Sequence, residues 1–133
     1  MSTAIMLDLP EILYQRLVSA AKATQRPLEE VVLRALRVGS PPGWEDAPEE
    51  VQAELSTLDS LDDESLYRVA RERWSPADVA RYDELLERQA DGRSSNEERG
   101  ELAQMREAHD RVVLRKAHAA AQLRWRGRAA PLF

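Results

Sequence analysis

Branched aliphatic residues occupy every second position from residue 5 to residue 9 of the chain, directly before a proline. On an extended backbone Ile5, Leu7 and Leu9 would share one face, which predicts a half-buried strand. The opposite face would carry Ala4, Met6 and Asp8. A lone strand leaves its backbone N–H and C=O groups unpaired, so we expect the same strand of a second copy to complete it. The pattern therefore predicts a homodimer.

Two helical patterns follow this strand. Pro10 suits the start of a helix, and the first apolar stripe consists of Leu13, Leu17, Ala20 and Ala21. Pro27 starts a second helix, whose apolar face consists of Leu28, Val31, Val32, Ala35 and Leu36. Gly39 ends that helix, and the Pro/Gly-rich segment after it cannot continue one. The order predicted for residues 1–38 is strand, helix, turn, helix.

This order resembles the ribbon-helix-helix family, the Arc and MetJ class of β-ribbon DNA-binding proteins. The residues that carry the resemblance are the alternating I-M-L-D-L, Pro10, Leu13 and Leu17, and the run from Ala21 to Leu36. The resemblance implies an intertwined dimer whose two-stranded ribbon enters the DNA major groove. It also implies an antitoxin, because many members join this module to a C-terminal segment that neutralises a toxin. The positions that match the DNA-contacting residues are Ala4, Met6, Asp8 and Arg26.

The sequence departs from the family's DNA-binding pattern at these same positions. Base edges are read by Arg, Lys, Asn or Gln, and phosphates repel an aspartate such as Asp8. Gln25 and Pro27 replace the small and hydroxylated residues with which the family's second helix holds phosphate. A dimeric protein–protein interaction scaffold without DNA binding is therefore the alternative to a DNA-binding regulator.

The rest of the chain predicts a linker over residues 39–47 and an α-helical domain over residues 48–133. A short helix starts at Pro48, and further helices are expected over residues 64–74, 76–90 and 96–126. Ser75 and Ser95 match helix caps, the second one in a capping box with Glu98. The last two helices would form an α-helical hairpin, so the fold class is mainly α.

The last helix is twice as long as its hairpin partner. We therefore expect its second half to lack a partner within this domain and to be available to another chain or a ligand. The apolar residues of that half are Val112, Val113, Ala117, Ala120 and Leu123.

Charge is strongly segregated, although the net charge is only −5. Residues 39–64 carry nine acids and no base, and residues 111–133 carry six bases and no acid. Such asymmetry indicates interaction surfaces. The residues expected to bind a partner are Glu45, Asp46, Glu49, Glu50, Arg115, Arg124, Trp125, Arg126 and Arg128.

Each charged stretch has more than one interpretation. The acids can cap helices and face solvent, or they can mimic nucleic acid and cover a basic groove on a partner protein. The basic end can pair with the acidic stretch of the same dimer, or it can bind nucleic acid through arginines and the stacking surface of Trp125.

Little in the sequence indicates catalysis. There is no cysteine, no phosphate-binding glycine loop and no activated serine. His109 and His118 are nine residues apart, on opposite faces of one helix, so they cannot share an intrachain metal. The acids around Asp59 lack the spacing of a calcium loop. We expect no enzyme, cofactor, metal or small-molecule substrate.

No apolar run is long enough to cross a bilayer, and the chain begins without a signal-peptide pattern, so a cytoplasmic location is expected. Together these features predict a dimeric, antitoxin-like transcriptional regulator. Its N-terminal module would bind operator DNA, and its helical domain would hold a toxin, with a nuclease as the expected class.

Overall fold

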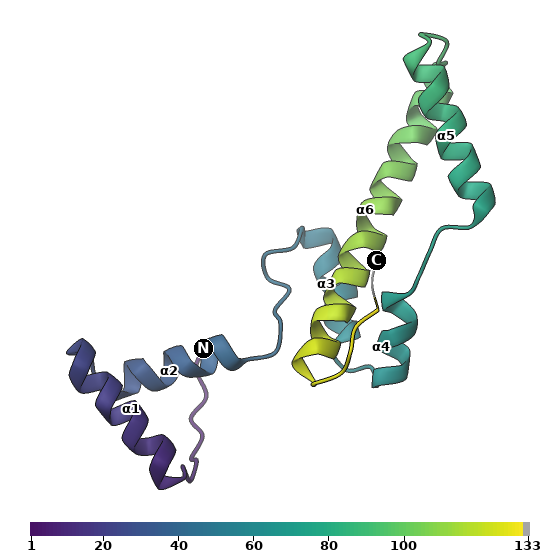
Figure 1. Cartoon of the computed structure of the whole chain (residues 1–133). Coiled ribbons are helices and arrows are strands. Elements are labelled where there is room, and N and C mark those ends of the chain that lie inside the picture. The colour runs from purple at the N-terminus through teal and green to yellow at the C-terminus, as the bar shows by residue number, and fades with distance from the viewer. Residues whose placement is uncertain (132–133) are drawn as a thin grey trace. The chain divides into compact units, whose positions relative to one another are not determined.

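The computed structural model describes residues 1–131, and the chain divides into two compact units (Figure 1). Unit 1 is Met1–Ser40, and unit 2 begins at Pro41. All regular secondary structure within the described residues is helical, which confirms a mainly α fold. No helix in this part of the chain is long and apolar enough to span a membrane.

Unit 1 is a pair of helices, α1 (Glu11–Thr24) and α2 (Leu28–Gly39). Each starts directly after a proline, Pro10 and Pro27, whose φ angles of −55° and −58° suit entry into a helix. Gln25 ends α1 in the left-handed conformation, with φ 53°, and this turn sends the chain back into α2. The two helices predicted from the sequence are confirmed.

The predicted strand is not seen in the single chain. Residues 1–9 have no regular secondary structure, and none of their backbone groups forms a hydrogen bond within the described chain. A strand exists only beside another strand, and no segment of unit 1 pairs with this one. The apolar side chains of the segment are correspondingly exposed: Ile5 by 74%, Leu7 by 58% and Leu9 by 38%.

Unit 2 is organised around one long helix, α6 (Asn96–Trp125). Three shorter helices pack against it: α3 (Glu49–Leu58), α4 (Asp63–Ala70) and α5 (Pro76–Ala90). Figure 1 shows α5 beside the first half of α6, and α3 and α4 beside its second half. The predicted hairpin of α5 and α6 is thus present. α4 ends four residues before Trp74, the end that the sequence predicted.

The core of unit 2 corrects one expectation from the sequence. The buried cluster consists of Leu55, Leu58, Leu66, Ala70, Ala119, Ala120 and Leu123. The second half of α6 is therefore covered within its own chain, because α3 and α4 fold back on it. Ala120 and Leu123 are 0% and 1% exposed, so the prediction that they lack a partner was wrong. Val113, at 47%, and Ala117 do remain exposed.

Most of the sequence-predicted linker lies on unit 2. Trp44 and Ala47 pack against the buried cluster. The Gln52 side chain donates hydrogen bonds to the backbone oxygens of Glu45 and Ala47, at 3.1 and 3.0 Å. The division between the two units falls after Ser40, so a free connection of nine residues between them is not observed.

Candidate functional site

Three polar side chains of unit 2 converge on the carboxylate of Asp59, the residue directly after α3. Asp59 Oδ1 lies 2.6 Å from His118 Nε2 and accepts a hydrogen bond from Gln122 Nε2 at 2.7 Å. Asp59 Oδ2 accepts a hydrogen bond from Trp44 Nε1 at 3.1 Å. His118 and Gln122 are buried, at 7% and 3% exposure, so these polar groups depend on one another rather than on solvent. We name these four residues the Asp59 network.

The C-terminal arginines of α6 complete this end of the unit. Arg126 donates to the backbone oxygens of Leu61 and Asp59, at 2.7 and 3.1 Å, and to Asp63 Oδ1 at 3.0 Å. Arg128 donates to Asp63 Oδ2 at 2.9 Å. Hydrogen bonding from Arg126, and then from Arg128, lowers the pKa of Asp63. These two arginines hold the turn between α3 and α4 onto α6.

Arg115 is also engaged within the chain. Its guanidinium lies 3.2 Å from a carboxylate oxygen of Glu54 and 3.6 Å from one of Glu72. Arg115 is 27% exposed, and its Nε and the Glu72 Oε2 are buried without a hydrogen bond of good geometry. Arg115, Arg126 and Arg128 of the basic end therefore pair with acids of their own chain, as one of its two sequence interpretations has it.

The other predicted partner residues form an exposed surface. Arg124 is exposed, and Trp125 is 51% exposed. The acids around the start of α3 all face solvent: Glu45, Asp46, Glu49 and Glu50. Two of them lie in the first turn of α3, where the helix dipole favours negative charge. None of these four acids takes part in an ion pair within residues 1–131, whereas Glu54 and Asp63 of the same acidic stretch do.

The predicted DNA-contacting residues lie in unit 1. Ala4, Met6 and Asp8 are exposed in the N-terminal segment, and Met6 is 95% exposed. Arg26 lies in the turn before α2, with Nη1 3.4 Å from Glu30 Oε1. Both of these side chains are half exposed, so the pair leaves the arginine accessible.

Between α1 and α2 runs an open groove of about 750 Å³. Its lining residues are Ala20, Thr24, Arg26, Glu30, Val31, Arg34, Ala35, Val38 and Gly39. Val38 is 80% exposed, and Ala21 is the single buried residue of unit 1. Unit 1 thus presents its apolar helix faces to solvent.

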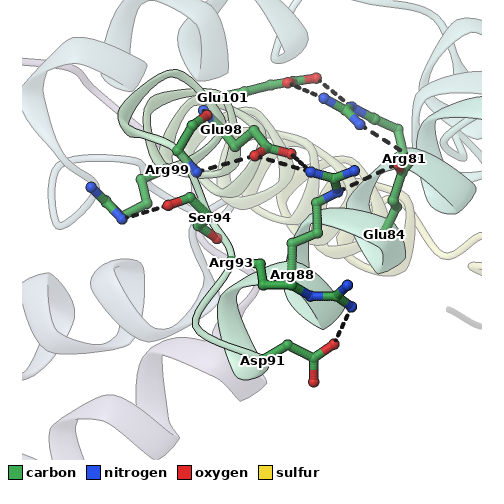
Figure 2. A network of polar contacts seen from close by, with 10 residues as sticks. Arg81, Glu84, Arg88, Asp91, Arg93, Ser94, Glu98, Arg99 and Glu101 are labelled. Atoms are coloured by element: carbon green, nitrogen blue, oxygen red, sulfur yellow. Dashed lines mark hydrogen bonds and ion pairs between the residues drawn. The ribbon is translucent and has the colours of Figure 1, made fainter.

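Charged residues of α5 and α6 pair at the tip of the hairpin (Figure 2). Arg81 donates two hydrogen bonds to Glu101, at 2.9 and 2.7 Å, and these lower the pKa of Glu101. Arg88 Nη1 lies 3.1 Å from Glu98 Oε2. The backbone N–H of Ser95 also bonds to Glu98 and lowers the pKa of its carboxyl. These contacts fix the pairing of the two helices.

Both histidines contact other side chains of unit 2. His109 contacts the ring of Trp74, with centroids 5.1 Å apart, and His118 belongs to the Asp59 network. No group of three or more potential metal ligands occurs among residues 1–131.

Sequence reasoning missed the Asp59 network as a unit. The sequence alone places Asp59 among acids and His118 on the last helix, fifty-nine positions away, with nothing that joins them. One signal was present: Arg115, His118, Gln122 and Arg126 follow one another at spacings of three and four, so they share a face of α6. A polar stripe on a helix that also carries buried alanines indicates a face that hydrogen-bonds to neighbouring elements.

Comparison with models of known families, with curated proteins and with solved structures finds no match to this chain.

Proposed function

We propose that the chain is a dimeric, antitoxin-like transcriptional regulator. Unit 1 forms the dimer and binds operator DNA, and unit 2 holds a partner toxin. The observation that carries this proposal is that unit 1 buries only Ala21. A segment of this size is stable only when it can bury apolar surface, so it needs a second chain.

The exposed apolar residues of unit 1 have the pattern that such a dimer requires. Leu13, Leu33 and Leu36, from both helices, are 39%, 44% and 48% exposed. The alternating residues 4–9 have free backbone groups, which the same segment of a second copy would pair in an antiparallel ribbon. That ribbon buries Ile5, Leu7 and Leu9 and turns Ala4, Met6 and Asp8 outward.

DNA binding would use this outward face together with the start of α2. Arg26 is half exposed there, and the first N–H groups of a helix attract phosphate. A dimer would present two copies of Arg26 and two N-termini of α2 to the DNA.

The partner surface of unit 2 is the exposed acidic group Glu45, Asp46, Glu49 and Glu50. Four carboxylates on one edge, without basic neighbours in the sequence, suit a protein whose own groove is basic. A toxin that acts on nucleic acid has such a groove, so a nuclease is the class of partner that this surface fits.

Sedimentation of the full chain tests the dimer. Leu7→Asp places a charge in the ribbon interface and should raise the dissociation constant of the dimer at least about 100-fold. Ala4→Asp is the matched control: it adds the same charge on the outward face and should leave the dimer intact. A wild-type chain that stays monomeric at high concentration would contradict the proposal.

DNA binding is tested with a duplex taken from the region directly upstream of the coding sequence. The wild-type chain should bind it, with an affinity that falls as salt rises. Ala4→Asp and Arg26→Ala should both weaken binding while the dimer persists.

The alternative function is a dimeric scaffold without DNA binding. It is favoured by the outward residues Ala4, Met6 and Asp8, which offer no side-chain donor to a base. A wild-type dimer that does not bind the upstream duplex even at low salt would support the scaffold and exclude the regulator.

A further inference from the structure

One face of α6 points away from α3, α4 and α5 and carries a symmetric arrangement of residues. At 100° per residue, positions 110, 113, 117, 121 and 124 fall within one narrow arc of the helix. The arc is accessible: Val113 is 47% exposed, Asp110, Ala117 and Arg124 are exposed, and Ala121 is partly so. We name this arc the outer face of α6.

Charges flank the apolar centre of the outer face at equal spacing. Asp110 precedes Ala117 by seven positions, and Arg124 follows it by seven. Neither charge takes part in an ion pair within residues 1–131, although seven other arginines of unit 2 do. An acid and a base at equal distances from a small residue complement themselves under a two-fold rotation.

We propose that the outer face of α6 binds the same face of a second copy, with the two helices antiparallel and the symmetry axis at Ala117. Asp110 then lies opposite the partner's Arg124, and Arg124 opposite the partner's Asp110. Val113 faces the partner's Ala121. The small side chain of Ala117 at the crossing allows the helix axes to approach to about 8 Å, the lower end of the usual range.

The arrangement is isologous, so every favourable contact occurs twice. One like-charge approach follows from the register: Arg106 comes opposite the partner's Arg128. Arg128 is already paired with Asp63 at 2.9 Å, which reduces its net charge. A parallel alignment would instead place Asp110 against the partner's Asp110 and Arg124 against the partner's Arg124.

This interface is separate from the dimer proposed for unit 1 and does not depend on it. If unit 1 also dimerises, it tethers two copies of unit 2 and raises their effective concentration for this second contact.

Cysteine cross-linking of the full chain tests the register, because the natural sequence has no cysteine. Ala117→Cys lies on the axis, so two copies should form a disulfide under mild oxidation. In the antiparallel pair the two copies of residue 113 are separated by about 12 Å along the helix direction. A disulfide allows a Cα separation of only about 7 Å, so Val113→Cys should not cross-link readily. We expect Ala117→Cys to cross-link at least about tenfold faster than Val113→Cys.

The matched control is Ala103→Cys, an exposed position on the same side of α6 outside the proposed contact. Equal rates at 103, 113 and 117 would indicate random collision and overturn the proposal. Fast cross-linking at both 113 and 117 would indicate a parallel alignment and also overturn it. If the outer face of α6 binds a different protein instead, Ala117→Cys in the purified chain should cross-link no faster than Ala103→Cys. That result would overturn the proposal as well.

Charge reversal gives a second, independent measurement on the Ala117→Cys background. Asp110→Arg alone and Arg124→Asp alone should each slow cross-linking several-fold, because each sets like charges against one another twice. The double variant should restore the rate. If Leu7→Asp abolishes the dimer of unit 1, the preference for position 117 should persist at higher protein concentration. Failure of one interface is thereby distinguished from failure of the other.

Discussion

His118 and Asp59, fifty-nine positions apart in the chain, meet with His118 Nε2 2.6 Å from Asp59 Oδ1. The contact joins the end of α3 to the buried face of α6. The same carboxylate also accepts hydrogen bonds from the side chains of Trp44 and Gln122. One side chain thus connects the entry segment of unit 2, α3 and α6.

We predict that Asp59→Ala lowers the free energy of unfolding of unit 2 by about 2–4 kcal/mol. The substitution leaves the buried His118 Nε2 without its acceptor, and it removes the shorter of the two hydrogen bonds that Gln122 donates, leaving the one to the backbone oxygen of Pro42 at 3.4 Å. Urea unfolding followed by circular dichroism measures the change. Asp46→Ala, an exposed acid nearby, is the control and should change stability by less than about 0.5 kcal/mol.

Truncation of Leu66 should lower the free energy of unfolding of unit 2 by an amount similar to that expected for Asp59→Ala. This side chain is 0% exposed in the cluster between α4 and α6. Leu66→Ala removes buried methyl groups and leaves a cavity, so we expect a loss of about 2–5 kcal/mol in the same unfolding experiment. Val79→Ala, at a position 46% exposed, should cost far less. Similar losses for the two variants would contradict the assigned core.

Unit 2 should lose stability in acid. Hydrogen bonding from Arg126 lowers the pKa of Asp63 in the folded state, and hydrogen bonding from Arg81 lowers that of Glu101. A carboxyl whose folded pKa is below its unfolded pKa favours folding above the unfolded value, and this stabilisation is lost as the pH falls through the folded pKa.

The loss should therefore develop below about pH 4. Urea unfolding at a series of pH values measures it, and Asp63→Asn should make the dependence shallower. An unchanged slope in Asp63→Asn would show that the pairing with Arg126 is absent in solution.

The start of α6 should depend on its capping box. The Ser95 side chain accepts a hydrogen bond from the backbone N–H of Glu98 at 3.1 Å, and the Glu98 side chain accepts one from the backbone N–H of Ser95 at 3.1 Å. Ser95→Ala should cost about 1 kcal/mol, and Ser95→Asp should retain most of the stability. Amide hydrogen exchange of the first turn of α6 should rise in the alanine variant only.

Local signals in the sequence were sufficient for most helix boundaries. Ser75 and Ser95 cap α5 and α6 as their motifs predict, and Asp62 caps α4 by accepting from the backbone N–H of Ser65. Prolines mark the starts of α1, α2 and α3. Such signals act within one turn of a helix, so a single sequence reveals them.

Contacts between distant segments were not predictable in the same way. The burial of Ala120 and Leu123 depends on α3 and α4 folding back across α6, and helix periodicity does not specify which helices meet. The Asp59 network likewise joins residues separated by up to 78 positions, from Trp44 to Gln122. The N-terminal strand differs again: its partner would be another molecule, so the fold of a single chain does not display it.

The helix α5 buries only Leu85, and its ion pairs to α6 are formed by partly exposed side chains. Local opening of such an element costs less free energy than unfolding of the cluster around Leu66. The hairpin end can therefore detach, exchange its amides or accept inserted residues at Gly92 while the rest of unit 2 stays folded. Insertions and deletions at the end of the hairpin of α5 and α6 are therefore the changes that the protein should tolerate best.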